Sequence, residues 1–184
     1  MYEILYIIGV CYINQTTDAK EIFDNLDELM SIYSIKYPEA RLLIGGDFNA
    51  RIANKISCDS FQLPPSNKFT FKRKSLDTTI NNRGIDLIDF AERNELFIAN
   101  GRFPGDEEGN FTYVNTQGRS VIDIVLCNFA ALYSIENFVV NNYLTKSDHF
   151  PVQVILHINN NKKCKLDKFI KWKDNKQIEY FKEM

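Results

Sequence analysis

The chain has 184 residues, of which 45% are hydrophobic and 13% aromatic. This length suits one domain with a real core, and the composition excludes a chain that is disordered throughout. Its 22 Lys and Arg residues and 24 Asp and Glu residues give a formal charge of −2. That balance excludes an indiscriminately basic nucleic-acid binder, but not an enzyme that meets a phosphate at one local site with the help of a bound cation.

The start of the chain predicts the order strand, helix, strand. Residues 3–12 are rich in Ile, Tyr and Val and predict a buried strand, and because no basic segment precedes them they indicate neither a secretion signal nor a membrane span. Asp18 is placed to cap a helix, with Glu21 in capping-box spacing, and Pro38 ends that helix. Residues 41–44 form the next strand. The apolar face of the helix consists of Ile22, Phe23, Leu26, Met30 and Tyr33.

The middle of the chain predicts a long loop and a second helix. Residues 54–81 are polar and irregular, with the basic run Lys72-Arg73-Lys74, and indicate a surface loop. Residues 83–94 have helical character. The side chains of this helix that are expected to face the core are Ile85, Leu87, Ile88 and Ala91.

Short runs with strand character follow, separated by clusters of Gly, Asn and Asp that are typical of turns. These runs are residues 96–99, 110–114, 121–126, 135–140 and 151–158. The predicted fold class is α/β, with two packed β-sheets flanked by helices. Residues 1–158 are expected to form the domain. Residues 159–184, with six lysines between positions 162 and 173, predict a Lys-rich linker and then a short helix from about residue 174.

The four cysteines are widely spaced, without a Cys-x-x-Cys pair or a nearby pair of histidines. A zinc site is therefore disfavoured. Reduced thiols in an intracellular protein are the preferred interpretation.

The first group of residues that could perform chemistry is Gly45-Gly46-Asp47-Phe48-Asn49, at the end of the second predicted strand. Alternation along an extended segment places Asp47 and Asn49 on the same side and sends Phe48 into the core. Asp47 could then orient and deprotonate a water, and Asn49 could donate to a phosphate oxygen. An ordinary turn at the end of a strand is the alternative interpretation of the same residues.

A second group, Ser147-Asp148-His149, precedes the last predicted strand. Because neighbouring residues of an extended chain point to opposite faces, Asp148 is poorly placed to orient the ring of His149. Asp123 is the natural partner, since it interrupts an apolar strand in which an unpaired charge is costly to bury. Such a pair would fix the tautomer of His149 and leave Asp148 free to bind a cation. An ordinary histidine at the start of a strand is the alternative.

Four segments taken together, GGDFNAR, NRGIDLIDFAERNELFIANG, GNFTYVNTQGRSVIDIVL and SDHFPV, resemble the endonuclease/exonuclease/phosphatase superfamily. They are most similar to the apurinic-type endonuclease domains of non-LTR retrotransposons, in the same order and over about residues 6–156. The resemblance implies a DNase I-like fold, of which this chain would hold the C-terminal part. It also implies a DNA-nicking enzyme that hydrolyses phosphodiester bonds with a water.

The resemblance implies roles for individual residues as well. Asp47 matches the residue that activates the attacking water, and Asn49 matches the residue that contacts the phosphate in the transition state. Asp123 and His149 match an aspartate–histidine pair that stabilises the phosphoryl oxygens. The remaining matches are a catalytic tyrosine that approaches the phosphate (Tyr12), a substrate-side threonine (Thr112) and a metal-site aspartate (Asp148).

The cofactor and partners follow from the same resemblance. They are one Mg²⁺ or Mn²⁺ ion, DNA, and the reverse-transcriptase domain of a parent element, whereas no membrane partner is expected. The family's domain begins with a strand–helix region that carries the main glutamate ligand of the cation, and that region is expected to be missing here. Action inside the cell, in the nucleus, is implied. A truncated remnant without catalytic activity and a phosphatase of the same superfamily stay open as alternatives.

Overall fold

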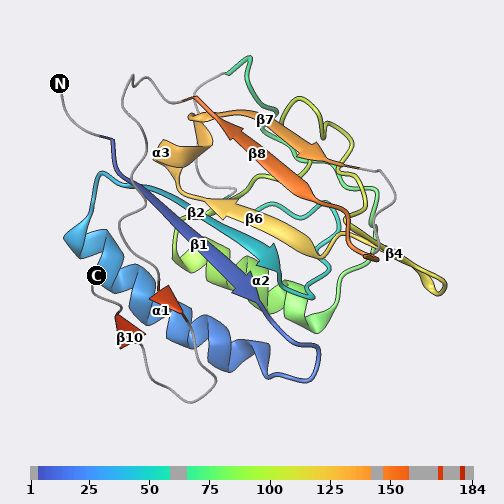
Figure 1. Cartoon of the computed structure of the whole chain (residues 1–184), viewed down its shortest axis with the longest axis horizontal. Helices are drawn as coiled ribbons and strands as arrows, with labels where there is room; N and C mark the ends of the chain where they lie inside the picture. Colours follow the sequence, from blue (N-terminus) through green and yellow to red (C-terminus); the bar gives the residue numbers. More distant parts are fainter. Residues whose placement is uncertain (1–3, 59–65, 142–146, 158–169, 172–178, 181–184) are drawn as a thin grey trace.

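The computed structural model describes residues 4–58, 66–141, 147–157, 170–171 and 179–180. Helices and strands alternate in the first half of the chain, and strands dominate the second half (Figure 1). The elements are β1 (Tyr6–Tyr12), α1 (Ala19–Lys36), β2 (Arg41–Asp47), α2 (Asn82–Arg93), β3 (Phe97–Ile98), β4 (Tyr113–Asn115), β5 (Gly118–Ser120), β6 (Asp123–Cys127), α3 (Phe129–Leu132), β7 (Ile135–Val140), β8 (Val152–Leu156), β9 (Ile170–Lys171) and β10 (Glu179–Tyr180).

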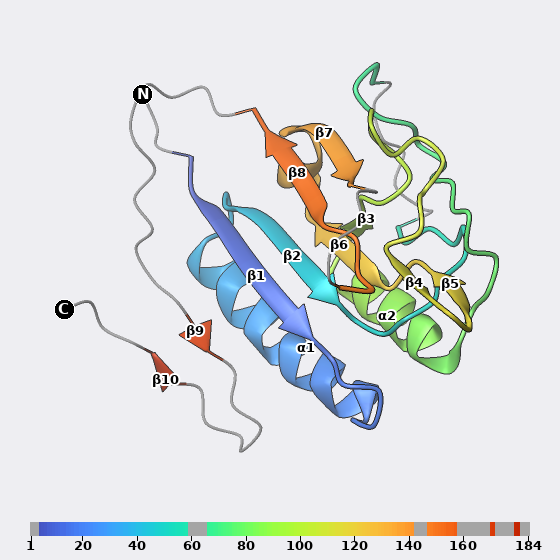
Figure 2. The ribbon, with the colours of Figure 1, turned by 45° about the vertical axis from the view of Figure 1, so that its right-hand side comes forward.

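A four-stranded sheet in the order β1-β2-β6-β3 forms the centre of the molecule. β1 and β2 run parallel, as a connection through a helix allows, and β6 is antiparallel to both of its neighbours. The two long helices, α1 and α2, lie against one face of this sheet (Figure 2). Between helices and sheet, the rings of Phe23 and Phe90 stack with their centroids 5.3 Å apart.

The opposite face of the central sheet packs against a second sheet, formed by β7 and β8, and against the short helix α3. Alternation along β2 and β6 sends Leu43 and Val125 to this side, while Ile44 and Ile124 face the helices. Phe138 of β7 is fully buried in this second core. The predicted arrangement of two packed sheets with helices outside is therefore present.

Both long helices begin at capping residues. Asp18 caps α1, as predicted, by accepting a hydrogen bond from Lys20 N at 3.0 Å. Asn81 caps α2 by accepting from Gly84 N at 2.7 Å, and the same oxygen accepts from Arg51 N at 3.0 Å. Because Arg51 follows β2, this shared cap fixes the start of α2 beside the end of β2.

The hairpin of β4 and β5 connects the central sheet with the segment that leads into β8. Tyr113 of β4 forms a bridge with His149. Backbone hydrogen bonds from Phe150 N to Thr112 O at 2.7 Å and from Val114 N to Asp148 O at 2.9 Å hold the same two segments together. Residues 147–150 consequently lie next to the start of β6.

Two expectations for the middle of the chain need correction. Ile85 is 50% exposed, because the capped start of α2 turns its side chain to solvent rather than to the core. The segment 54–81 is not only a surface loop, since Arg73 is 3% exposed and Asp77 is 2% exposed. The Arg73 guanidinium donates to the carbonyls of Ala53, Lys55 and Asn100, so that it anchors the loop to the core.

The later elements also differ in part from expectation. β5 and α3 were not predicted, because the three or four residues of each carry no periodic pattern. The short helix expected from about residue 174 is not formed at Glu179–Tyr180, which pair with Ile170–Lys171 as antiparallel strands. Its other residues, and most of the predicted linker, lie outside the described residues.

Cys11, Cys58 and Cys127 carry free thiols, as expected, while Cys164 lies outside the described residues. Burial is the main cause that raises the pKa of these three thiols, to about 11 for Cys11 and Cys58 and about 12 for Cys127. Among the described residues, no helix has the length and apolar character needed to cross a membrane.

Candidate active site

The first side of the site is the end of β2, where the chain turns sharply after two glycines. A Cβ on Gly46, which has φ +150°, would lie 1.9 Å from the carbonyl oxygen of Cys11 in β1, so only glycine fits. Phe48 is fully buried, as predicted, while Asp47 and Asn49 both lie on the open side. Asn49 has φ 50°, a left-handed conformation that Asn tolerates better than most residues.

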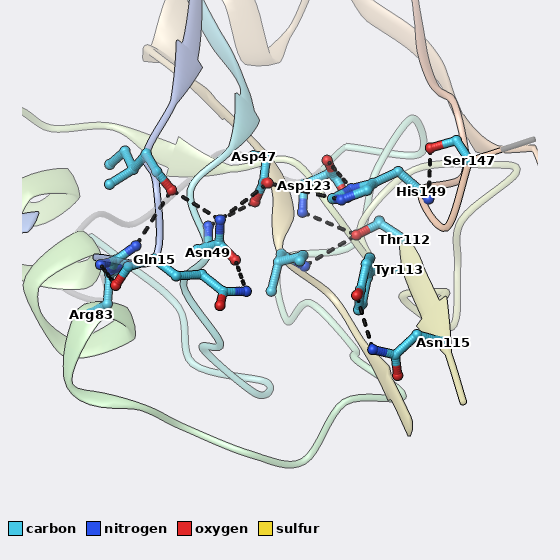
Figure 3. Close-up of polar contacts among 12 residues, drawn as sticks. Gln15, Asp47, Asn49, Arg83, Thr112, Tyr113, Asn115, Asp123, Ser147 and His149 are labelled. Atoms are coloured by element: carbon cyan, nitrogen blue, oxygen red, sulfur yellow. Dashed lines mark hydrogen bonds and ion pairs between the residues drawn. The ribbon is translucent and has the colours of Figure 1, made fainter. Parts of the chain in front are cut away.

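Asp47 and Asn49 form one hydrogen-bonded unit (Figure 3). Asn49 N donates to Asp47 Oδ1 at 2.9 Å, and Asn49 Nδ2 donates to Asp47 Oδ2 at 3.2 Å. The same amide nitrogen donates to Ile13 O at 2.9 Å, and Asn49 Oδ1 accepts from Gln15 Nε2 at 3.2 Å. The orientation of the Asn49 amide is therefore determined by three neighbours, and that amide in turn orients the Asp47 carboxylate.

The second side of the site is the start of β6, where Asp123 lies opposite Asp47 in the antiparallel register. His149 Nδ1 lies 2.9 Å from Asp123 Oδ2 and 3.1 Å from Asp123 Oδ1. Its other ring nitrogen, Nε2, lies 3.9 Å from Asp47 Oδ2. The structure thus brings together four of the residues that the sequence singled out, Asp47, Asn49, Asp123 and His149 (Figure 3). The two ring nitrogens of His149 face the two carboxylates.

Thr112 and Tyr113 contact the Asp123–His149 pair and hold it in position. The Thr112 hydroxyl is buried and accepts hydrogen bonds from Ile122 N at 3.1 Å and Asp123 N at 3.0 Å. The Tyr113 ring packs edge-on against the His149 ring, with centroids 4.8 Å apart. The structure gives Thr112 a positioning contact to the Asp123 backbone, and its expected contact with a substrate stays a prediction.

The electrostatic surroundings of Asp47 favour proton uptake. Burial raises the pKa of this carboxyl above its ordinary value, and the nearby charge of Asp123 acts in the same direction. The hydrogen bond from Asn49 N and the charges of His149 and Arg83 act against the rise without cancelling it. A carboxylate whose pKa is raised is a better base for a water than an ordinary surface aspartate.

Arg83 was not singled out from the sequence. Its guanidinium holds the turn after β1: Nη1 donates to Asn14 O at 3.0 Å, and Nη2 donates to Gln15 O at 3.1 Å and Thr17 O at 2.8 Å. The available signal was its place in the first turn of a helix, where the helix dipole disfavours a cation. An arginine at such a position indicates a partner outside the helix.

Tyr12 and Asp148 lie at the edges of the cluster. Tyr12 is paired in register with Asp47 and its side chain is 71% exposed. Asp148 is exposed, and its backbone oxygen accepts the hydrogen bond from Val114 N. Their expected roles, towards the phosphate for Tyr12 and towards a cation for Asp148, stay predictions.

The described residues alone do not fit a divalent cation. Among them there is no group of three or more His, Cys, Asp or Glu side chains that could hold a metal ion. Both oxygens of Asp123 contact His149, and both oxygens of Asp47 accept hydrogen bonds from Asn49. Mg²⁺ needs near-octahedral oxygen coordination, often from one or two carboxylates and several waters. Asp148 could therefore contribute only as one ligand among others.

Comparison with known proteins gives a family for the sequence and a related fold for the structure. The sequence profile of a family described as endonuclease-reverse transcriptase matches residues 6–153. The endonuclease domain of TRAS1, a telomere-specific non-LTR retrotransposon, is similar in structure, with a TM-score of 0.55 and 18% identity, over 81% of this chain and 56% of that chain. A 3′-5′ exonuclease from Neisseria meningitidis gives a TM-score of 0.49 and 15% identity, over 74% of this chain and 52% of that chain.

No curated protein matches the chain in sequence. The chain spans about half the length of the two solved structures. The profile match and the likeness to the TRAS1 domain confirm the resemblance stated from the sequence, including the DNase I-like α/β fold.

Proposed function

The chain belongs to the endonuclease–reverse transcriptase family, and from this premise we propose that it carries the catalytic centre of a DNA-nicking endonuclease derived from a non-LTR retrotransposon. The observation that supports this most is the placement of His149 between Asp47 and Asp123, with Asn49 fixing the orientation of Asp47. DNA is the proposed substrate, and a reverse-transcriptase domain of the parent element is the proposed covalent neighbour. The proposed place of action is intracellular and nuclear.

The reaction is hydrolysis of a phosphodiester. A water placed beside Asp47 Oδ2 gives its proton to that carboxylate, and its oxygen forms the new bond to phosphorus. The bond from phosphorus to the leaving sugar oxygen breaks, and that oxygen takes up a proton from solvent, so that a phosphomonoester and a free hydroxyl result. The raised pKa of Asp47 favours the proton transfer, and the Asn49 amide keeps the carboxylate aimed at the water.

His149 acts on the phosphoryl oxygens. Because Asp123 occupies Nδ1, the ring presents Nε2 to the space in front of Asp47. When the ring carries a proton on each nitrogen, Nδ1–H donates to Asp123 and Nε2–H can donate to a phosphoryl oxygen as negative charge develops on it. Thr112 and Tyr113 keep the pair in place, the first through the Asp123 backbone and the second through the His149 ring.

A divalent cation stays part of the proposal only as a prediction. Family membership favours Mg²⁺ or Mn²⁺, and a cation could offset charge on the phosphate and the leaving oxygen. Since the donor set of the described residues does not fit the ion, the proposed steps use only the side chains of Asp47, Asn49 and His149. Asp148 is the residue that we propose as one of its ligands.

The competing proposal is a remnant without activity. The observation that favours it is the apolar surface of β1, where Ile8 is 65% exposed and Val10 is 90% exposed. Apolar surface on an edge strand is typical of a part that is completed by another chain or segment. No contact of the described residues favours a phosphatase over a nuclease.

Conversion of supercoiled plasmid to open circles, with Mg²⁺ or Mn²⁺ and with EDTA as the blank, tests the proposal. The folded chain is expected to nick, and His149→Ala is expected to lose about 10²–10³ in rate, as for removal of one oxyanion donor. His157→Ala is the matched control, because His157 also pairs with a carboxylate, Glu136, at 2.6 Å, but directly after β8 and away from the site.

The results of this nicking assay distinguish the active nuclease from the inactive remnant. A parent chain that is folded and monodisperse yet leaves the plasmid supercoiled would support the inactive remnant. Nicking by His149→Ala at the parental rate would assign the activity to a contaminant.

A further inference from the structure

A polar cavity of about 290 Å³ opens directly beside the proposed catalytic residues. Its volume is at the lower end of the range for small-ligand pockets, which is about 300–1,000 Å³. It lies between the turn after β1, the start of α2 and the β4–β5 hairpin. The side chains that line it are Gln15, Asn49, Arg51, Asn81, Arg83, Tyr113, Ser120 and Ile122.

The lining of the cavity is cationic, although the chain as a whole has a formal charge of −2. It contains two arginines and no carboxylate. Arg51 is held by Asp77 through two hydrogen bonds, Nη2–Oδ1 at 2.7 Å and Nε–Oδ2 at 2.9 Å, but a third of its side chain (33%) stays exposed, against 1% for Asp77. Asp77 therefore fixes the guanidinium from behind and leaves its outer part open.

The second guanidinium of the lining, that of Arg83, is held by carbonyl groups. In the described part of the chain, its hydrogen bonds go to backbone carbonyls and no ion pair forms. Carbonyl dipoles hold a guanidinium in place without neutralising its charge. The two guanidinium groups of the lining are paired with one carboxylate, Asp77, while Asp47, on which the charge of Arg83 also acts, lies outside the lining beyond Asn49. The lining itself therefore carries an excess of positive charge, which suits an anion rather than a neutral sugar or base.

The cavity and the catalytic cluster share two residues. Asn49 lines the cavity and also hydrogen bonds to Asp47, while Tyr113 lines it and packs against His149 (Figure 3). A nucleic-acid strand whose scissile phosphate lies in front of Asp47 and His149 would therefore have this cavity on one side of that phosphate. A ligand with a single phosphodiester has no second anion to place there.

We propose that this cavity binds the phosphate next to the scissile one on the same nucleic-acid strand, with Arg51 as its main donor and Arg83 supplying the positive field. The inference rests on the proposed function for the position of the scissile phosphate. It predicts that the protein binds a nucleic-acid strand, which has a second phosphate, more tightly than a ligand with a single phosphodiester. It also assigns the Arg51–Asp77 pair a binding role in addition to its structural one.

The test is binding of a short fluorescein-labelled single-stranded oligodeoxynucleotide, measured by anisotropy in EDTA over a range of salt concentrations. Arg51→Gln is expected to weaken binding about tenfold and to reduce the slope of log affinity against log salt by roughly 0.7, as for loss of one contact to a single strand. The matched control is Arg93→Gln, because Arg93 also donates through Nε and Nη2 to one aspartate, Asp27, at 3.1 and 2.7 Å, but far from the cavity.

The proposal would be overturned if Arg51→Gln bound the oligodeoxynucleotide with the parental affinity and salt dependence. It would also be overturned if Arg93→Gln lost as much affinity as Arg51→Gln. Since Arg51→Gln leaves the buried Asp77 without its partner, Gln15→Glu provides a second variant that spares that pair. Gln15 is exposed and lines the cavity, so an added negative charge there is expected to weaken binding, whereas Gln153→Glu on β8 is not. Equal binding by these two variants would also overturn it.

The two proposals can fail separately. If the parent chain nicks plasmid but binding is indifferent to Arg51 and Gln15, the adjacent-phosphate site is wrong and the nuclease proposal stands. If binding depends on Arg51 and Gln15 but the parent chain does not nick, the cavity binds phosphate and the nuclease proposal is wrong.

Discussion

Two histidines of this chain contact a carboxylate, and their surroundings differ. His157 and Glu136 lie 2.6 Å apart, with side chains 49% and 46% exposed, so solvent screens the pair. His149 and Asp123 lie 2.9 Å apart with side chains 35% and 18% exposed. The ring of His149 also lies 3.9 Å from a second carboxylate, that of Asp47. This second carboxylate and the lower exposure place His149 in the proposed catalytic cluster.

The pKa values of two aspartates in this region, Asp47 and Asp77, are shifted in opposite directions from the ordinary value of an aspartate. Burial raises the pKa of Asp47, with the charge of Asp123 contributing. Burial alone would also raise the pKa of Asp77, but hydrogen bonds from Arg51, Thr79 N and Val121 N lower it overall. A carboxyl ¹³C NMR titration should show Asp47 changing at higher pH than Asp77. The reverse order would contradict the electrostatic account of the site.

These shifts have opposite consequences for stability. Asp77 binds its proton less readily in the folded chain, so it stabilises the fold above the unfolded-state pKa of about 3.9. This contribution to the free energy of unfolding is lost as the pH falls through the lower pKa of the folded state. Asp47 binds its proton more readily in the folded chain, so its contribution to the free energy of unfolding is present at low pH. That contribution is lost as the pH rises through the raised pKa of Asp47. Denaturant unfolding of Asp77→Asn should therefore differ most from the parent at neutral pH and converge with it in acid.

At the scale of elements, the contact between α2 and the end of β2 depends on Gly84. A Cβ at this position would lie 1.9 Å from the Arg51 carbonyl oxygen. Ala is better than Gly inside a helix by about 1 kcal/mol, but a methyl group forced into a packed contact costs about 1–3 kcal/mol, and here the neighbour is backbone. We therefore expect Gly84→Ala to lower the free energy of unfolding by about 2 kcal/mol in urea titrations.

Gly9→Ala is the control for this substitution. Its added Cβ would meet Ile44 Cγ1 at 3.5 Å, which is an ordinary contact. If Gly84→Ala is as stable as the parent, α2 does not need its close approach to the segment after β2, and this account of the contact would be wrong.

The elements that form the site were predictable to the extent that local pattern determines them. Alternation placed Asp47 and Asn49 on one side of an extended segment, and the cost of burying a lone charge identified Asp123 as the partner of His149. The cavity was not predictable, because Arg51 and Arg83 acquire their roles from contacts with Asp77 and with the turn after β1, far apart in sequence. Hydrogen bonds between distant loops leave no periodic signal.

At the scale of the whole molecule, β1 is an edge strand of the described sheet with an apolar outer surface. Ile8, Val10 and Tyr12 are 65%, 90% and 71% exposed. An apolar groove of about 720 Å³ runs from this strand to β8 and reaches His149. The proposed catalytic site therefore lies at one end of an apolar groove. A partner that binds in this groove would contact His149.

The chain is expected to self-associate through this edge as its concentration rises, because an open apolar edge strand favours pairing with another chain. Val10→Lys should shift sedimentation-velocity profiles towards the monomer. Ile35→Lys is the control, since Ile35 is 84% exposed on α1 and not on the edge. A parent chain that stays monomeric at all concentrations, or an equal effect of both variants, would contradict this expectation.

The most direct test of the central claim is a double-mutant cycle on plasmid nicking with Asp123→Asn, His149→Ala and both together. If Asp123 acts through His149, as their 2.9 Å contact indicates, each single variant loses most of the rate and the double variant loses little more. The account predicts a parent chain that nicks and losses that do not multiply. A parent chain that does not nick, or losses of the two variants that multiply, would contradict it.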